Sequence, residues 1–317
     1  MTVRLPQNYI PLHYDLYIHY SKTIFLFDAS ATITFQKNQD SDRVTLMASK
    51  NLLIEKVIQN DIELKYELQY PKLVIFRSTE QDISDFPITI KYTLQPVFPD
   101  SHDGFFLYRK DNIPSFLTQF EPNFTSTLLP CFDEPCIRSS FRVKIRIPSD
   151  LVGLSNMPAE TTTVIDDEKE ITFLPTPPMC CYLLSIFVGP FYKSVKGITK
   201  NGTPIIIYSY DIDDEISEMY LRMAVHSVNW LEENMGAKYE LPHLQFLSYE
   251  GIGVGMENYG LIALYDFNKC DMIANSVVVM HEIAHLWFGD LVSIKWWDSI
   301  WLNEGFAQYF EYLILRD

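Results

Sequence analysis

The sequence predicts two domains, an all-β domain at residues 1–208 followed by a mixed α and β domain at residues 209–317. Three observations support this prediction. The length of 317 residues is enough for two packed domains of about 150 residues each. Apolar and polar residues alternate in the first part, as in half-buried strands. In the second part apolar residues recur at three- and four-residue steps, as in amphipathic helices.

The strands of the first part are clearest at residues 29–35 and 141–147, where every second residue is apolar. Turn-forming residues separate such runs at Pro71, at Pro87 and at residues 96–100, 148–150 and 175–178. This punctuation favours antiparallel hairpins around a sheet core.

The second part begins with a turn at residues 202–204 and a predicted strand at 205–210. A helix is then predicted from apolar residues at helical spacing, namely Met219, Met223, Val225, Val228 and Leu231. Residues 275–289 should form another helix, with Asn275 or Ser276 as the N-cap and Gly289 at the end. A further helical run is expected at residues 304–313.

The charge of the chain excludes some classes of partner. Its 41 acidic and 25 basic side chains give a net charge of -16. Such a chain repels a phosphate backbone, so we expect no nucleic-acid partner. Residues 209–317 hold 18 acidic and 5 basic side chains, so the acidity is concentrated there. A solvated acidic face is the common explanation, and a site that attracts cations is the alternative.

No transmembrane or targeting segment is expected. Apolar stretches such as residues 277–280 are much shorter than the ~20 residues that span a bilayer. Charged residues and prolines among the first twenty residues interrupt any signal-like apolar core. We therefore expect a cytoplasmic location. The glycosylation sequons at Asn123 and Asn201 would matter only in a secreted or membrane-anchored form, which is the alternative if the N-terminus was cut.

The five cysteines do not suggest a disulfide framework or a structural zinc site, because they lack paired CxxC spacing. We expect them to be small buried or neutral residues. They are Cys131, Cys136, Cys180, Cys181 and Cys270.

The helix predicted at residues 275–289 carries a metal-binding pattern. His281 and His285 are four residues apart and therefore lie on one face, where two imidazoles can reach one ion. Glu282 lies beside them, so the segment is the HExxH arrangement of a zinc hydrolase, with the glutamate as the general base.

The third metal ligand is expected from Glu304, which follows His285 after 18 residues. Two histidines and a carboxylate leave one zinc position open. Zinc is favoured over iron, although ligand type alone does not exclude other divalent metals. The alternative is two core histidines and a surface glutamate that share this spacing by chance.

Longer segments carry a family resemblance. Residues 281–292 and 296–306 closely resemble the zinc aminopeptidases of the aminopeptidase N and puromycin-sensitive aminopeptidase family. Residues 118–122 and 130–135 look like that family's first-domain signature, and residues 254–258 look like its GAMEN exopeptidase motif. The resemblance runs along essentially the whole chain. It implies a saddle-like all-β N-terminal domain followed by the first part of an α+β thermolysin-like catalytic domain.

The resemblance also implies peptide substrates with a free N-terminus. Glu257 would hold the α-ammonium group, with Glu121 as a second carboxylate. Two buried anions suit one cation, because a buried charge is costly unless it is paired. The main chain at Gly255 and Met256 would lie along the peptide as an added strand. The substrate-binding residues implied in this way are Gln119, Glu121, Gly255, Met256, Glu257 and Asn258.

The sequence departs from the family pattern in three places, one of which is a shorter stretch between Gly260 and His281. Val254 stands where the family usually has glycine. A later tyrosine that stabilises the oxyanion in the family is matched by neither Tyr309 nor Tyr312. The missing C-terminal part of such an enzyme is therefore one expected partner.

Three functions follow, and a zinc aminopeptidase is the leading one. The second is a catalytically impaired fragment or pseudoenzyme that binds zinc and peptide N-termini without turnover. The third, ranked last, is a hydrolase of lipid epoxides, as in the family's bifunctional branch.

Overall fold

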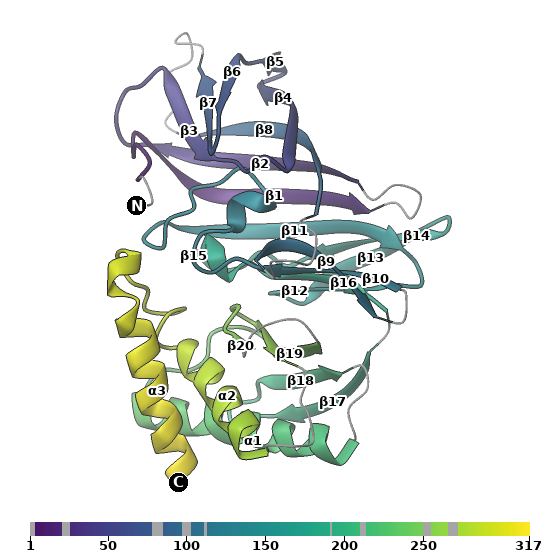
Figure 1. Ribbon diagram of the computed structural model, residues 1–317, viewed down its shortest axis with the longest axis vertical. Coiled ribbons are helices and arrows are strands. Elements are labelled where there is room, and N and C mark those ends of the chain that lie inside the picture. Colours follow the sequence, from purple (N-terminus) through teal and green to yellow (C-terminus); the bar gives the residue numbers. More distant parts are fainter. Residues whose placement is uncertain are drawn as a thin grey trace. The chain divides into compact units, whose positions relative to one another are not determined.

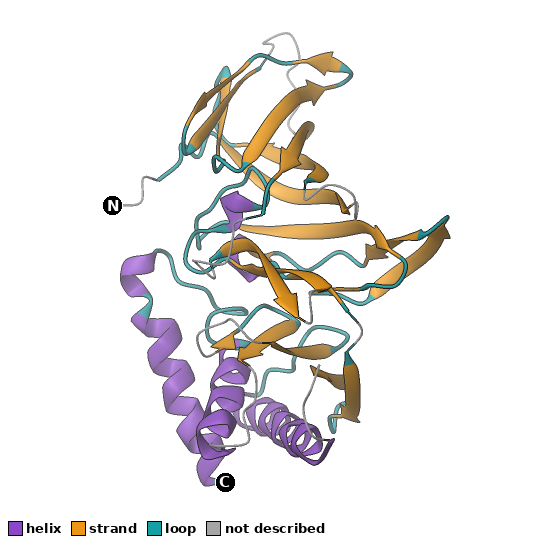
Figure 2. Cartoon of the chain, turned by 45° about the vertical axis from the view of Figure 1, so that its right-hand side comes forward, coloured by secondary structure: helices purple, strands orange, loops and turns teal. Residues whose placement is uncertain are grey.

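The computed structural model consists of two compact units. The first unit comprises Met1–Gly153 and Ala159–Gly189, and the second comprises Leu154–Pro158 and Pro190–Asp317. The described residues are 4–20, 26–77, 85–96, 103–110, 113–190, 192–209, 214–249, 255–265 and 272–317. Strands dominate the first unit, and the α-helices of the described chain lie in the second, which confirms the predicted fold class (Figures 1 and 2). The domain boundary at residue 208 stays a prediction.

The described strands of the first unit form three sheets. The largest has the order β13-β14-β11-β1-β2-β8-β4-β5, with β15 also paired to β11, and the two smaller sheets have the orders β3-β7-β6 and β12-β16-β10-β9. The strands are β1 (Tyr9–Tyr20), β2 (Phe27–Lys37), β3 (Arg43–Met47), β4 (Leu52–Gln59), β5 (Ile62–Glu63), β6 (Tyr66–Gln69), β7 (Lys72–Phe76), β8 (Asp85–Leu94), β9 (Gly104–Lys110), β10 (Ile113–Gln119), β11 (Arg138–Pro148), β12 (Val152–Ser155), β13 (Ala159–Ile165), β14 (Glu168–Phe173), β15 (Met179–Cys180) and β16 (Ile186–Gly189).

The strands predicted at residues 29–35 and 141–147 are confirmed as parts of β2 and β11. The alternation of apolar and polar residues in these strands reflects their burial, because every second residue of each strand is buried. One pairing differs from the expected antiparallel hairpins, since β1 and β11 are parallel, with Tyr14 opposite Phe141. Parallel neighbours require a long connection, and here most of the first unit lies between the two strands.

The second unit contains one five-stranded sheet and three α-helices among its described residues. Its sheet order is β17-β18-β19-β21-β20. The helix α1 connects the parallel strands β18 and β19. The elements are β17 (Lys193–Ile198), β18 (Pro204–Ser209), α1 (Asp214–Met235), β19 (Leu244–Tyr249), β20 (Gly255–Met256), β21 (Leu261–Tyr265), α2 (Met272–His285) and α3 (Trp301–Arg316). Three short 3-10 helices, at Thr125–Thr127, Cys181–Leu183 and Trp297–Ser299, complete the described elements of the chain.

The three predicted helices are confirmed, but the bounds of α2 were wrong. The helix begins at Met272, so Asn275 and Ser276 lie inside it and do not form its N-cap. A capping residue contributes only about 1 kcal/mol, which tertiary packing of the helix outweighs. Gly289 does lie beyond the helix end, with a φ of 139° that favours glycine.

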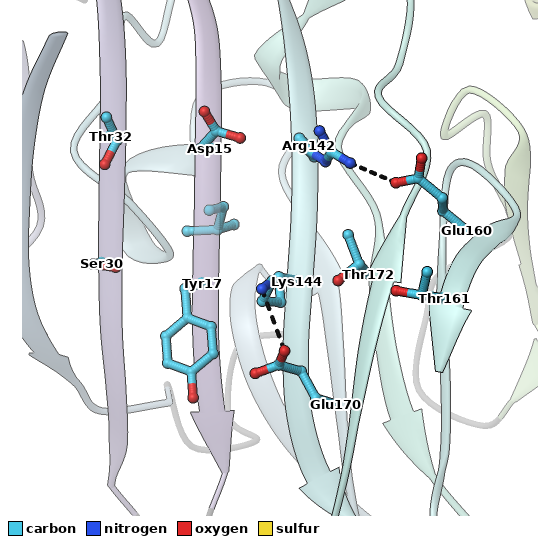
Figure 3. A pocket seen from close by; sticks show the side chains of 11 residues that line it. Asp15, Tyr17, Ser30, Thr32, Arg142, Lys144, Glu160, Thr161, Glu170 and Thr172 are labelled. Atoms are coloured by element: carbon cyan, nitrogen blue, oxygen red, sulfur yellow. Dashed lines mark hydrogen bonds and ion pairs between the residues drawn. The ribbon is translucent and has the colours of Figure 1, made fainter. Parts of the chain in front are cut away.

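A hollow of about 740 Å³ lies on the large sheet of the first unit (Figure 3). Two ion pairs lie in this hollow, one between Arg142 and Glu160 and one between Lys144 and Glu170. None of the predicted site residues lines it.

No helix among the described residues is long and apolar enough to cross a bilayer.

Candidate metal and substrate site

The helix α2 brings the two histidines of the HExxH segment together. His281 Nε2 and His285 Nε2 lie 3.0 Å apart. The opposite side of the helix is buried in the unit, since Ile283 is fully inaccessible to solvent, as is Ala284 on the flank. This packing fixes the rotation of α2 and directs both imidazoles to one point, as the four-residue spacing predicts.

Glu304 reaches the same point from the first turn of α3. Its Oε2 atom lies 3.3 Å from His281 Nε2 and 3.6 Å from His285 Nε2. Ligands of one tetrahedral zinc ion are about 3.3 Å from each other, so these three atoms fit a zinc ion with little movement. Burial raises the pKa of Glu304, but hydrogen bonds from His281 and His285 outweigh it and hold that pKa at about 2. The carboxylate is thus ionised, as a metal ligand must be.

The second ring nitrogen of each histidine also has a partner. His281 Nδ1 lies 2.7 Å from Glu311 Oε2, and His285 Nδ1 lies 3.1 Å from the carbonyl oxygen of Phe288. If each Nδ1 donates its proton to that oxygen, each Nε2 keeps its lone pair for the metal.

Glu311 is a residue that the sequence analysis missed. It lies seven residues after Glu304, which is two helical turns, so both carboxylates lie on one face of α3. Its side chain is buried, although glutamate is usually exposed. The seven-residue spacing was the available signal, but it identifies a partner only once α3 is known to pack against α2.

Glu282 is buried beside the histidines. Burial raises its pKa to about 8, the Glu257 carboxylate adds to this effect, and His285 opposes it. A buried glutamate whose pKa is raised in this way is suited to general acid–base chemistry.

The strand β20 approaches Glu282 closely at Gly255. A Cβ atom at this glycine would lie only 2.1 Å from Glu282 Oε1, which is far inside van der Waals contact. The absence of a side chain therefore lets the main chain of β20 lie against the carboxylate. In the sheet order β20 is the end strand, paired with β21 at Met256 and Ala263, so its other edge suits an added peptide strand.

Glu257 lies at the end of β20 with only 3% of its surface exposed. Its Oε1 atom has no hydrogen-bond partner within the described part of the chain. One ligand atom each of Glu257, Glu282 and His285 lie within 4.8 Å of one another. Two buried carboxylates this close require a proton or a cation between them. Asn258, fully buried, likewise has free amide atoms among the described residues.

Gln119 and Glu121 belong to the first unit. Gln119 is the last residue of β10, and its buried Oε1 has no partner in the described chain. Glu121 is half-buried two residues later. Their role in substrate binding stays a prediction.

Both parts of the chain match models of known protein families. The profile of the Peptidase M1 N-terminal domain matches residues 10–183, and that of the Peptidase family M1 domain matches residues 219–317. The chain is 31% identical to a puromycin-sensitive aminopeptidase of Caenorhabditis elegans, over 98% of this chain and 35% of that protein. It is 32% identical to endoplasmic reticulum aminopeptidase 2 of Bos taurus, over 99% of this chain and 36% of that protein. The chain thus spans about a third of the length of these relatives.

Proposed function

Because the chain belongs to the M1 peptidase family, we propose that it is a zinc aminopeptidase that removes single amino acids from the N-termini of peptides. One observation carries this proposal. His281, His285 and Glu304 converge on one point, with the buried Glu282 and Glu257 beside them. The relatives named as aminopeptidases support the same reaction class.

His281, His285 and Glu304 would hold the zinc ion. When bound, zinc would supply the Lewis acidity that makes water a nucleophile near neutral pH and polarises a carbonyl group. Glu282 would take the proton of the attacking water and return it to the leaving amine.

The substrate's α-ammonium group would pair with Glu257, whose buried Oε1 is free among the described residues. A mid-chain peptide segment has no such cation and would leave this carboxylate buried and unmatched. The reaction is therefore expected at the N-terminus and not within a peptide. The edge of β20 would orient the first residues of the peptide.

The test is hydrolysis of a panel of aminoacyl-aminocoumarins by the purified chain, with zinc measured on the same sample. Zinc-dependent release from free substrates, but not from N-acetylated ones, supports the proposal. Bound zinc without turnover would instead support a protein that binds zinc and peptide N-termini. Neither zinc nor turnover would contradict both. A cytoplasmic location stays a prediction.

Glu311→Gln is expected to weaken zinc binding about 10- to 100-fold, because outer carboxylates that orient a ligating histidine have effects of this size. Zinc affinity is measured by competition with a chromophoric chelator. Glu240→Gln, an exposed glutamate on a loop, serves as the control. Equal zinc affinity of Glu311→Gln and the unmodified chain would show that Glu311 does not position His281.

Gly255→Ala is expected to lower turnover by up to about 10²-fold with zinc retained, because the added methyl group would displace the Glu282 carboxylate. Gly305→Ala is the matched control, since a Cβ atom there meets nothing within 4 Å. The comparison of kcat and zinc content for both variants tests the prediction. Unchanged kcat in Gly255→Ala would mean that the position of Glu282 does not depend on β20.

A further inference from the structure

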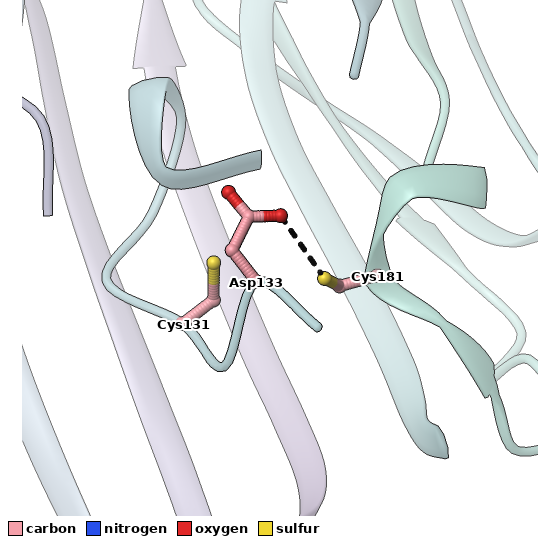
Figure 4. A group of neighbouring side chains, drawn as sticks. All are labelled: Cys131, Asp133 and Cys181. Atoms are coloured by element: carbon pink, nitrogen blue, oxygen red, sulfur yellow. Dashed lines mark hydrogen bonds between the residues drawn. The ribbon is translucent and has the colours of Figure 1, made fainter. Parts of the chain in front are cut away.

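A second group of metal-ligating side chains lies in the first unit, apart from the candidate active site. This thiol cluster consists of Cys131, Asp133 and Cys181 (Figure 4). All three residues are buried, with exposed fractions of 0%, 7% and 4%. Cys131 and Asp133 lie on the loop before β11, and Cys181 begins the short 3-10 helix after β15. The fold therefore brings together two segments that are about 50 residues apart in the sequence. No CxxC motif in the sequence predicts this cluster.

The donor atoms of the cluster are as close as the ligands of one metal ion. One atom from each residue lies within 4.8 Å of the other two. Cys181 Sγ lies 3.6 Å from Asp133 Oδ1, and sulfur and oxygen ligands of one tetrahedral zinc ion are about 3.5 Å apart. The carbonyl oxygen of Phe132, 3.2 Å from Cys181 Sγ, offers a fourth donor.

Neighbouring hydrogen bonds hold the side chain of Asp133 and the main chain of Cys131. Asp133 Oδ2 accepts the N–H of Ser126 at 3.0 Å, which leaves Oδ1 facing the cysteine sulfur. Cys131 exchanges two main-chain hydrogen bonds with Met47, at 2.8 and 3.0 Å. A carboxylate that is hydrogen-bonded through its other oxygen is typical of carboxylate metal ligands.

The charge of the cluster also favours a cation. Asp133 is buried and makes no ion pair with any residue that the structure describes. A divalent cation bound by this carboxylate and two thiolates would supply the missing counter-charge and release the thiol protons to solvent.

We propose that Cys131, Asp133 and Cys181 form a structural binding site for a thiophilic divalent cation of the zinc class. Thiolate ligands select such ions over magnesium or calcium. A disulfide between the two cysteines is the competing reading. It would need an external oxidant and would leave Asp133 buried without a counter-charge, whereas a metal ion uses all three donors.

The test is a titration of the purified, reduced chain with Cd²⁺, followed by thiolate-to-metal charge-transfer absorption in the near ultraviolet. The site at His281, His285 and Glu304 contains no sulfur and is silent in this absorption. The band is expected to saturate with one Cd²⁺ ion bound at the thiol cluster, whether or not a second ion fills the silent site. Glu304→Ala is expected to retain it, so the result does not depend on the proposed peptidase function.

Two adjacent cysteines provide matched variants. Cys181→Ala is expected to lose the band, and Cys180→Ala to keep it, because the Cys180 thiol donates to the carbonyl of Pro135 outside the cluster. Asp133→Asn keeps both thiols and is expected to weaken Cd²⁺ binding by at least about 10-fold. Circular dichroism verifies folding of each variant, and Asp133→Asn decides the question if Cys181→Ala does not fold.

Three results would overturn the proposal. The first is the absence of a charge-transfer band in the folded, unmodified chain. The second is a band that survives in Cys181→Ala or an unchanged affinity in Asp133→Asn. The third is a chain that is isolated with a disulfide between Cys131 and Cys181, detected as a mass loss of two hydrogen atoms. After reduction, such a chain would bind no metal at the thiol cluster.

Discussion

Glu282→Gln is expected to reduce peptide hydrolysis by about 10²- to 10⁴-fold, the usual contribution of a positioned general base. Glutamine has nearly the same shape but cannot accept the proton of the attacking water. The zinc content should stay unchanged, because Glu282 lies next to the three metal ligands without being one of them. The measurement is kcat and zinc content of the same preparations with an aminoacyl-aminocoumarin substrate.

Two further variants make this result specific. Glu304→Gln is expected to lose both zinc and turnover, since it removes the third ligand at 3.3 Å from His281 Nε2. Glu240→Gln, an exposed carboxylate, should change neither. A Glu282→Gln variant that keeps its turnover, or that loses zinc as Glu304→Gln does, would contradict the proposed division of roles.

The histidine pair could be predicted because its geometry is local. Positions i and i+4 share a helix face whatever the helix packs against, so the sequence was enough to bring His281 and His285 together. Glu304 required one further element, the helical run predicted at residues 304–313, and its position 18 residues after His285 indicated the third ligand. The start of α2 was wrong because a cap residue is a weak signal beside tertiary packing.

The roles of residues that depend on tertiary packing could not be predicted from the sequence. Glu311 contacts His281 only because α3 packs against α2. The sequence separation of the two helices does not predict which of their residues face each other. The thiol cluster was missed for the same reason, since Cys131 and Cys181 become neighbours only through the sheets of the first unit. The parallel pairing of β1 with β11 also joins segments far apart in the chain, which local turn signals do not report.

The second large effect is expected from substitution of the buried Glu257. Glu257→Gln is expected to lower kcat/KM for peptides with a free N-terminus by about 10²- to 10⁴-fold. The physical reason is the loss of a buried charge pair, which costs about 3–5 kcal/mol when one partner is removed. The substrate's α-ammonium group would then be desolvated without its counter-charge. The measurement is kcat/KM for one dipeptide aminocoumarin in both proteins, at equal zinc content.

The choice of substrate separates ammonium binding from a general disturbance of the site. An N-acetylated substrate has no cation to lose, so any residual hydrolysis of it should change little in Glu257→Gln, and the preference for free N-termini should shrink. Glu257→Asp keeps the charge on a shorter side chain and should recover part of the activity towards free peptides. If Glu257→Gln lowered the rates of free and acetylated substrates equally, Glu257 would support the fold around Glu282 and would not recognise the N-terminus.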